Sequence, residues 1–159
     1  MGIFKKQKCL YAVCNGRSTN ISEIPDEALA GGMLGVGFAM EPADGAFCSP
    51  ADGRVESVAE TGHAYTIHTD EGLDVLVHIG VDTVGLHGEG FEPLVQDGQK
   101  VRAGTPLARV NIEFIKSKGL PAMTAVLVTN PEKIEEMDYR FGNSAGGKDA
   151  VMFFRIRKG

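Results

Sequence analysis

The residues of this sequence best suited to chemistry are two histidines, His63 and His78, in two strand-like runs that flank the turn-forming stretch 69–72. A turn centred on that stretch places His63 directly opposite His78 in an antiparallel pair, with Cβ atoms about 4.5–5.5 Å apart. Thr61 points to the same side, because side chains alternate along a strand with a period of two. The spacing predicts a cluster of one hydroxyl and two imidazoles, which a three-residue loop or a β-bulge would separate by shifting the register.

Paired imidazoles favour two kinds of chemistry. A neutral imidazole is a good nucleophile, and a second imidazole can donate hydrogen bonds to the oxygens of a phosphoryl group, whose transfer depends mainly on positioning and charge stabilisation. Two histidines on adjacent strands are also half of a tetrahedral zinc site, although the sequence shows no third ligand near them. The residues alone therefore leave open phosphoryl transfer, metal binding and an unrelated pair of half-buried strand histidines.

Frequent turn signals place the chain in the all-β class. Its 21 glycines recur at short intervals, often after Asp or Asn, as expected for many short strands joined by tight turns. Residues 15–21 and 52–58 both open an apolar stretch with Gly-Arg, which hints at an internal duplication. We expect an antiparallel β-sandwich or barrel, with strands at 54–59, 64–68, 73–79, 106–110, 125–129 and 151–156.

Two short helices are expected beside the strands. One spans residues 130–139, with an asparagine as N-cap and a proline at the first helical position. The other spans residues 111–118, between an asparagine and a glycine. A length of 159 residues suits one domain, which we place at residues 9–159 behind a flexible N-terminal segment, residues 1–8.

Composition excludes several partners and locations. The net charge of −5, without a basic stripe, argues against nucleic acid. The apolar runs are far shorter than the ~20 residues that span a bilayer, and the lysine-rich start lacks the apolar core of a secretory signal, so we expect a cytoplasmic protein without a transmembrane segment. Cys9, Cys14 and Cys48 lack the spacing of a disulfide framework or a zinc site and are expected to be reduced.

The segment around His78 resembles the signature of a known family. Residues 72–84, which read GLDVLVHIGVDTV, are similar to the phosphohistidine motif of glucose-type enzyme IIA domains of the bacterial phosphoenolpyruvate-dependent sugar phosphotransferase system. The resemblance runs from about residue 9 to the end of the chain and implies one β-sandwich domain built from a duplicated hybrid motif. It also includes four shorter segments, at 47–53, 61–64, 88–91 and 97–101.

The resemblance implies a role for each residue of the cluster. His78 is expected to accept a phosphoryl group through Nε2 from the small carrier HPr and to pass it to a cysteine of enzyme IIB. His63, supported by Thr61, is expected to assist by hydrogen bonding. The backbone carbonyl of Gly80 would hold Nδ1 of His78, and Asp82 would belong to an acidic rim that meets a basic surface on HPr.

A glycine-rich apolar stretch, residues 31–38, is expected to pack around this site and to offer partners a hydrophobic surface that includes Val36 and Phe38. Val36 stands where related proteins often carry Asp, so we expect a weaker or different partner contact there. The stretch lacks the Gly-Lys-Ser/Thr ending of a phosphate-binding loop.

Two other functions stay open from the sequence. A regulatory binding protein whose phosphorylation state reports sugar uptake would use the same residues, with a zinc ion bridging His63, His78 and a carboxylate of the partner. A zinc hydrolase of related fold needs a His-x-His pair, whereas residues 78–80 read His-Ile-Gly. We therefore expect no required cofactor. The sequence does not identify the imported sugar, because selectivity resides in the membrane subunit.

Overall fold

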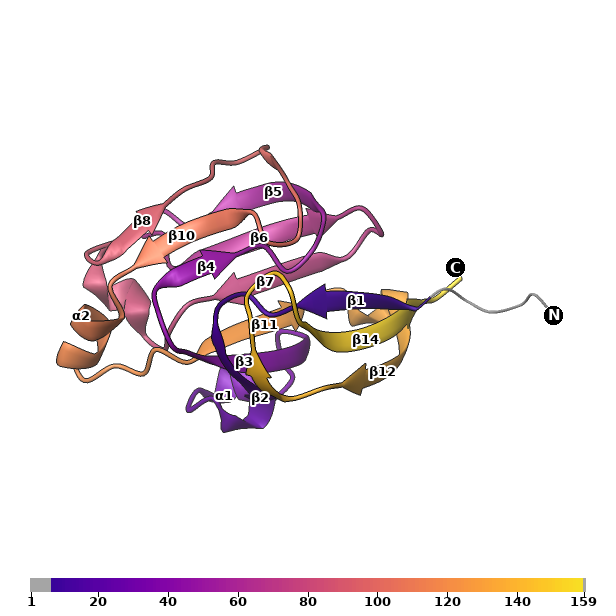
Figure 1. Ribbon diagram of the computed structural model, residues 1–159, viewed down its shortest axis with the longest axis horizontal. Coiled ribbons are helices and arrows are strands. Elements are labelled where there is room, and N and C mark those ends of the chain that lie inside the picture. Colours follow the sequence, from indigo (N-terminus) through magenta and orange to yellow (C-terminus); the bar gives the residue numbers. More distant parts are fainter. Residues whose placement is uncertain (1–6, 159) are drawn as a thin grey trace.

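The computed structural model describes residues 7–158, and most of its regular structure is β-strand (Figure 1). The strands are β1 (Lys8–Tyr11), β2 (Gly16–Asn20), β3 (Val36–Pro42), β4 (Ala46–Cys48), β5 (Gly53–Val58), β6 (Ala64–Thr69), β7 (Asp74–His78), β8 (Phe91–Pro93), β9 (Lys100–Val101), β10 (Pro106–Val110), β11 (Thr124–Val128), β12 (Ile134–Tyr139), β13 (Gly142–Ser144) and β14 (Ala150–Ile156). Short helical elements connect them: α1 (Glu27–Ala30), α2 (Ile112–Ser117) and the 3-10 turns η1 (Ile21–Glu23), η2 (Thr83–Leu86) and η3 (Pro131–Lys133).

Three sheets enclose the main hydrophobic core. An eight-stranded sheet has the order β13-β2-β3-β11-β7-β6-β5-β9, and two three-stranded sheets have the orders β4-β10-β8 and β1-β14-β12. Neighbouring strands run antiparallel. Buried side chains from all three sheets meet in one cluster, among them Val77, Leu107 and Phe154. In Figure 1, β1, β14 and β12 lie together at the right, beside the long strands of the large sheet. The expected antiparallel β-sandwich is confirmed.

Strand β7 carries one of the two histidines on the face opposite this core. Val75 and Val77 are fully buried, whereas Leu76 and His78 are half-buried, as the alternation of a strand requires. The six strands expected from the sequence are present with shifts of at most one residue at their ends, and β10 has the expected bounds. Period-two alternation therefore decides that His78 points away from the main core.

The outer face of the large sheet has a smaller hydrophobic cluster of its own. Helix α1, which the sequence did not predict, is capped by Asp26 Oδ1 and places Leu29 on this face. Leu29 packs with Val81 and Ala125 in a buried cluster. Since Ala125 pairs with His78 in the ladder between β11 and β7, this cluster supports the strand end from which His78 projects.

The helix expected over residues 130–139 is not formed, so that prediction is wrong. Residues 131–133 make a single 3-10 turn, and residues 134–139 continue as β12, paired with β14. This pairing leaves Ile134 only 2% exposed, in the main core. Tertiary pairing with a partner strand therefore outweighs the local capping signals.

Two asparagines with the same apparent capping role behave differently. Asn111 caps α2 by accepting a hydrogen bond from Phe114 N, so the helix expected at residues 111–118 is confirmed. Asn130 does not cap η3 with its side chain. It instead accepts from Asp74 N and donates to Gly72 O, and so ties the turn between β6 and β7 to the end of β11.

The N-terminal boundary is one residue earlier than expected, because Lys8 already belongs to β1. Residues 1–6 of the expected flexible segment lie outside the described residues. The three cysteines are free thiols, as expected. Within residues 7–158, no helix is long and apolar enough to cross a membrane.

Candidate functional site

The rings of His63 and His78 meet edge to face. Their centroids are 5.1 Å apart and their planes are inclined by 82°. His63 immediately precedes β6 and is 9% exposed, whereas His78 is the last residue of β7 and is half-buried. The structure therefore brings together the two imidazoles that the sequence singled out.

The ladder register differs by one residue from the one expected, which is a correction. His78 pairs with Ala64 rather than with His63. The loop between the strands behaves as a three-residue turn, residues 70–72, in which Thr69 N donates to Leu73 O and Gly72 has φ +90°. The sequence analysis placed the centre of the turn half a residue too early.

The rings still meet because His63 lies outside the regular strand. It follows Gly62, whose φ is +71°, so the direction of its side chain is not set by the alternation of side chains along β6. A Cβ at Gly62 would lie 3.0 Å from Pro93 Cγ, so β8 packs tightly against this bend. Ile79 N donates to His63 O at 2.8 Å, which joins the bend to the end of β7.

Thr61 reaches the first imidazole, as predicted. Its hydroxyl forms a hydrogen bond with Nδ1 of His63. A hydroxyl can donate or accept, so this contact is compatible with either neutral tautomer of the ring. When the hydroxyl donates, the proton of the neutral ring lies on Nε2, where it can be donated to a ligand.

The tautomer of His78 is fixed by a backbone carbonyl. Nδ1 of His78 lies 3.0 Å from Gly80 O. A carbonyl oxygen only accepts, so neutral His78 carries its proton on Nδ1 and has a lone pair on Nε2. Gly80 has φ +76°, and a Cβ there would lie 2.4 Å from Thr83 Cγ2, so the turn requires glycine.

The electrostatic environment favours the neutral form of His63. Burial lowers the pKa of His63 below its usual 6.5, and the neighbouring His78 lowers it further. A ring with a lowered pKa is neutral at about pH 7. His63 is therefore a hydrogen-bond donor or acceptor rather than a fixed positive charge.

The residues expected at a partner surface divide into exposed and buried ones. Asp82 is exposed and adopts the left-handed conformation, with φ +60°. Phe38 is 0% exposed and cannot meet a partner, because its side chain fills the main core. Gly80 is also buried and acts through its carbonyl. Val36 is half-buried, but Ala39 rather than Val36 is level with His78 across β11.

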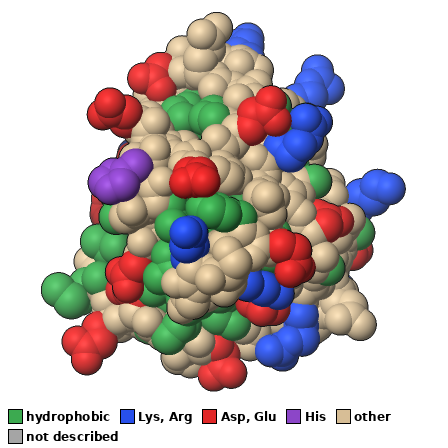
Figure 2. All heavy atoms as spheres, turned by 90° about the vertical axis from the view of Figure 1, so that its left-hand side faces the viewer, with side chains coloured by type: hydrophobic (Ala, Val, Ile, Leu, Met, Phe, Trp, Pro, Cys, Tyr) green, Lys and Arg blue, Asp and Glu red, His purple; other side chains and the backbone are tan. Residues whose placement is uncertain are grey.

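Other apolar residues are more exposed than those expected. Met33 and Leu34 are 82% and 43% exposed, so part of the expected glycine-rich stretch does face outward. Val84, which the sequence analysis did not select, is 56% exposed and follows Asp82 in η2. Val84 could have been selected from the sequence, because it lies within the signature, two residues after Asp82. Figure 2 shows the end of the molecule that carries α2, where acidic side chains surround an exposed histidine on the left and basic ones gather on the right.

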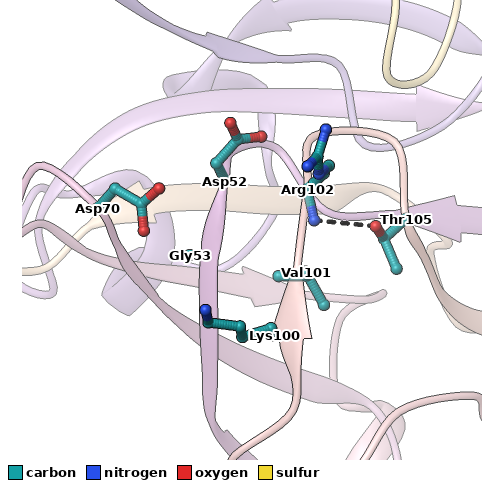
Figure 3. Close-up of a pocket in the computed structure, with 7 residues that line it drawn as sticks. All are labelled: Asp52, Gly53, Asp70, Lys100, Val101, Arg102 and Thr105. Atoms are coloured by element: carbon teal, nitrogen blue, oxygen red, sulfur yellow. Dashed lines mark hydrogen bonds between the residues drawn. The ribbon is translucent and has the colours of Figure 1, made fainter.

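A separate hollow of about 440 Å³ lies at the other end of the β6–β7 hairpin (Figure 3). Thr105 Oγ1 accepts from Arg102 N, and Asp52 Oδ1 accepts from Ala103 N. Neither histidine lines this hollow, and two of its polar side chains, Asp52 and Thr105, already bond to the backbone of the protein, so it is not the candidate site. Its lining residues are Asp52, Gly53, Asp70, Lys100, Val101, Arg102 and Thr105.

The histidine pair does not form a complete metal site by itself. Among residues 7–158, no group of three or more His, Cys, Asp or Glu side chains is placed to hold an ion. The pair offers two imidazole nitrogens, and zinc in proteins prefers four ligands.

A β-sandwich that brings two imidazoles into contact, one of them with its tautomer fixed by a backbone carbonyl, has the groups that histidine-dependent group transfer requires. Residues 8–134 match the family model described as phosphoenolpyruvate-dependent sugar phosphotransferase system, EIIA 1, so the chain belongs to this family. It is 43% identical over 129 residues to the PTS system glucose-specific EIIA component of Staphylococcus aureus, with 81% of this chain and 78% of that protein covered.

Further relatives agree with this assignment. The glucose-specific EIIA component of Staphylococcus epidermidis is 38% identical over 128 residues, which are 80% of this chain and 77% of that protein. The solved structure of glucose permease IIA from Mycoplasma capricolum superposes with a TM-score of 0.89 at 32% identity, covering 96% of this chain and 99% of that chain. The chain is therefore a phosphocarrier component of the sugar phosphotransferase system, as its resemblance implied.

Proposed function

We propose that His78 accepts a phosphoryl group from phosphorylated HPr through Nε2 and transfers it to a cysteine of enzyme IIB, in the cytoplasm, during sugar import. The observation that carries this proposal is the hydrogen bond of Nδ1 with Gly80 O, which leaves the lone pair on Nε2. The contact between the two imidazole rings supports it. Membership of the EIIA family supports the choice of donor and acceptor.

The two transfers are simple displacements at phosphorus. In the first, the Nε2 lone pair of His78 forms an N–P bond while the N–P bond of the donor breaks and its electron pair returns to the donor imidazole. In the second, the cysteine thiolate forms an S–P bond while the bond to Nε2 breaks. His78 returns to its neutral form, with the proton still on Nδ1.

His63 assists by stabilising charge on the phosphoryl group. With the Thr61 hydroxyl donating to Nδ1, Nε2 of His63 carries a proton and can donate it to a phosphoryl oxygen. The lowered pKa keeps this ring neutral, so the donor is in place without a protonation step. Donors fixed before the reaction are the main source of catalysis in phosphoryl transfer.

Labelling with enzyme I, HPr and radioactive phosphoenolpyruvate tests the acceptor. The wild-type chain should acquire acid-labile label, and His78→Ala should acquire none. His68→Ala is the matched control, because His68 is 52% exposed and pairs with Asp74 at the other end of the hairpin. Label that survives in His78→Ala, or no label in the wild type, would reject the proposal.

The sugar and a regulatory role require separate tests. The relatives named above are called glucose-specific, which supports glucose as the first sugar to test, by transfer to IIB domains of glucose and other sugar transporters. For regulation, we propose that zinc binds His63 and His78 only when a partner adds a carboxylate. Equilibrium dialysis of the chain alone should then show only weak Zn²⁺ binding, and strong binding without a partner would contradict this.

A further inference from the structure

We propose that Thr83 is a positioning residue that holds the Gly80 carbonyl on Nδ1 of His78. This inference rests on the proposed function for its role in transfer, but its structural part is independent of it. Thr83 is 1% exposed, and its hydroxyl donates to Ile79 O at 2.5 Å. It thus closes a five-residue loop, residues 79–83, that begins with the residue directly after the histidine.

The same side chain also contacts Gly80. The methyl carbon Cγ2 of Thr83 occupies the space where a Cβ of residue 80 would lie, only 2.4 Å from that position. The hydroxyl and the methyl group of Thr83 therefore hold the two residues that follow His78. A second bond, from Val81 N to Pro121 O at 3.0 Å, fixes the other side of the Gly80 peptide.

The loop needs such a closure because its backbone is not otherwise favourable. Gly80 and Asp82 both have positive φ, at +76° and +60°. A non-glycine residue in the left-handed region persists only where its surroundings hold it there. The buried bond from Thr83 to Ile79 O spans these two residues, so its loss leaves the Gly80 peptide held by the bond from Val81 N to Pro121 O and lets its carbonyl shift away from His78.

Without the contact between Gly80 O and Nδ1 of His78, the proton of the neutral ring would no longer be fixed on Nδ1. The proton of a neutral imidazole is placed by the hydrogen bond that one nitrogen makes. Without the Gly80 acceptor, His78 would also populate the form with the proton on Nε2, which has no lone pair there to attack phosphorus. Thr83 would in this way control the nucleophile without touching the phosphoryl group.

The test separates the hydroxyl of Thr83 from its methyl group. Thr83→Val retains the shape and removes the hydrogen bond, whereas Thr83→Ser retains the hydroxyl and removes the methyl group. Thr69→Val is the matched control, because Thr69 is 2% exposed and its hydroxyl accepts from Leu73 N at the far end of the same hairpin. The readouts are the ¹⁵N chemical shifts of the His78 ring, measured at alkaline pH, and the rate of phosphorylation by HPr.

Thr83→Val should move His78 toward the Nε2-protonated form and slow phosphorylation by about tenfold, a typical effect of removing a group that orients a histidine. Thr83→Ser and Thr69→Val should retain the wild-type tautomer. A wild-type ¹⁵N pattern in Thr83→Val, or an equal change in Thr69→Val, would overturn the proposal. If Thr83→Val does not fold, Thr83→Ala takes its place with the same expected and contrary results.

Failure of this inference is distinguishable from failure of the proposed function. If His78 is not the phosphoryl acceptor, the wild type will not be labelled there, yet the tautomer comparison still applies. If only the role of Thr83 is wrong, the wild type and Thr83→Val will be labelled at the same rate.

Discussion

His63 and His78 bring their ring centroids to 5.1 Å from each other, although the ladder pairs His78 with Ala64. The contact depends on the bend at Gly62, which frees His63 from the alternation of β6. The pair is thus made by the last residue of β7 and the residue just before β6, the strand that precedes β7 in the chain. His78 is only half-buried there, so part of its side chain is accessible to a partner protein.

His63→Gln should still accept phosphate but pass it on about 10²-fold more slowly, since loss of a preorganised donor typically costs 10²–10³ in rate. Glutamine can occupy much of the same space but cannot reproduce the bond from Thr61 to Nδ1. Rapid-quench measurement of transfer to IIB gives the rate. Transfer at the wild-type rate would remove the assisting role.

Stability of the wild type should fall relative to His63→Gln as the pH drops below about 6.5, the usual pKa of histidine. The folded-state pKa of His63 is lowered by burial and then by His78. Above that pH the ring is neutral in both states and contributes no pH dependence. Below it the unfolded chain binds the proton more readily, so stability is lost down to the folded-state pKa. Urea denaturation at several pH values measures this, and parallel profiles would contradict it.

Tyr65→Phe should stabilise the protein by about 1 kcal/mol. Tyr65 is 0% exposed, and its hydroxyl has no hydrogen-bond partner among residues 7–158. Burial also raises the pKa of this hydroxyl to about 12. Thermal unfolding measures the change, with Tyr139→Phe as a control at a half-buried site. A lower melting temperature for Tyr65→Phe would show that the hydroxyl has a partner in solution.

Gly37→Ala should destabilise the protein by about 1–3 kcal/mol, the usual range for overpacking. A Cβ at Gly37 would lie 1.8 Å from Val126 O, so β3 and β11 would have to separate. Gly85→Ala is the control, because no atom lies within 4 Å of its added Cβ. Equal stabilities of the two variants in denaturant would contradict the close approach.

Asp82→Asn should slow association with HPr several-fold at low salt and have less effect at high salt, because rim charges act mainly on the association rate. Asparagine tolerates the left-handed conformation of residue 82, so the loop is retained. Asp70→Asn removes an exposed charge at the other end of the hairpin and should have no effect. Stopped-flow measurements that show equal association rates for Asp82→Asn and the wild type would exclude a steering role.

The sequence was sufficient to predict the fold class, six of the fourteen strands within residues 7–158 and the contact between His63 and His78. Glycine-rich turns and period-two alternation are local properties, so segments such as 106–110 could be located from them. The signature around His78 identified the family because it combines several residues at fixed spacing. The hydrogen bond from Nδ1 of His78 to Gly80 O was implied by that resemblance and is present.

Only the tertiary structure decided the register, the fate of residues 134–139 and the exposure of the expected partner surface. Ile134 lies in a strand rather than in the expected helix, because pairing with β14 buries its side chain. Phe38 is buried because the core of the sandwich closes over it, and Thr83 reaches Ile79 O because the loop folds back. Local spacing determines which side chains are available, whereas packing between distant segments determines which atoms meet.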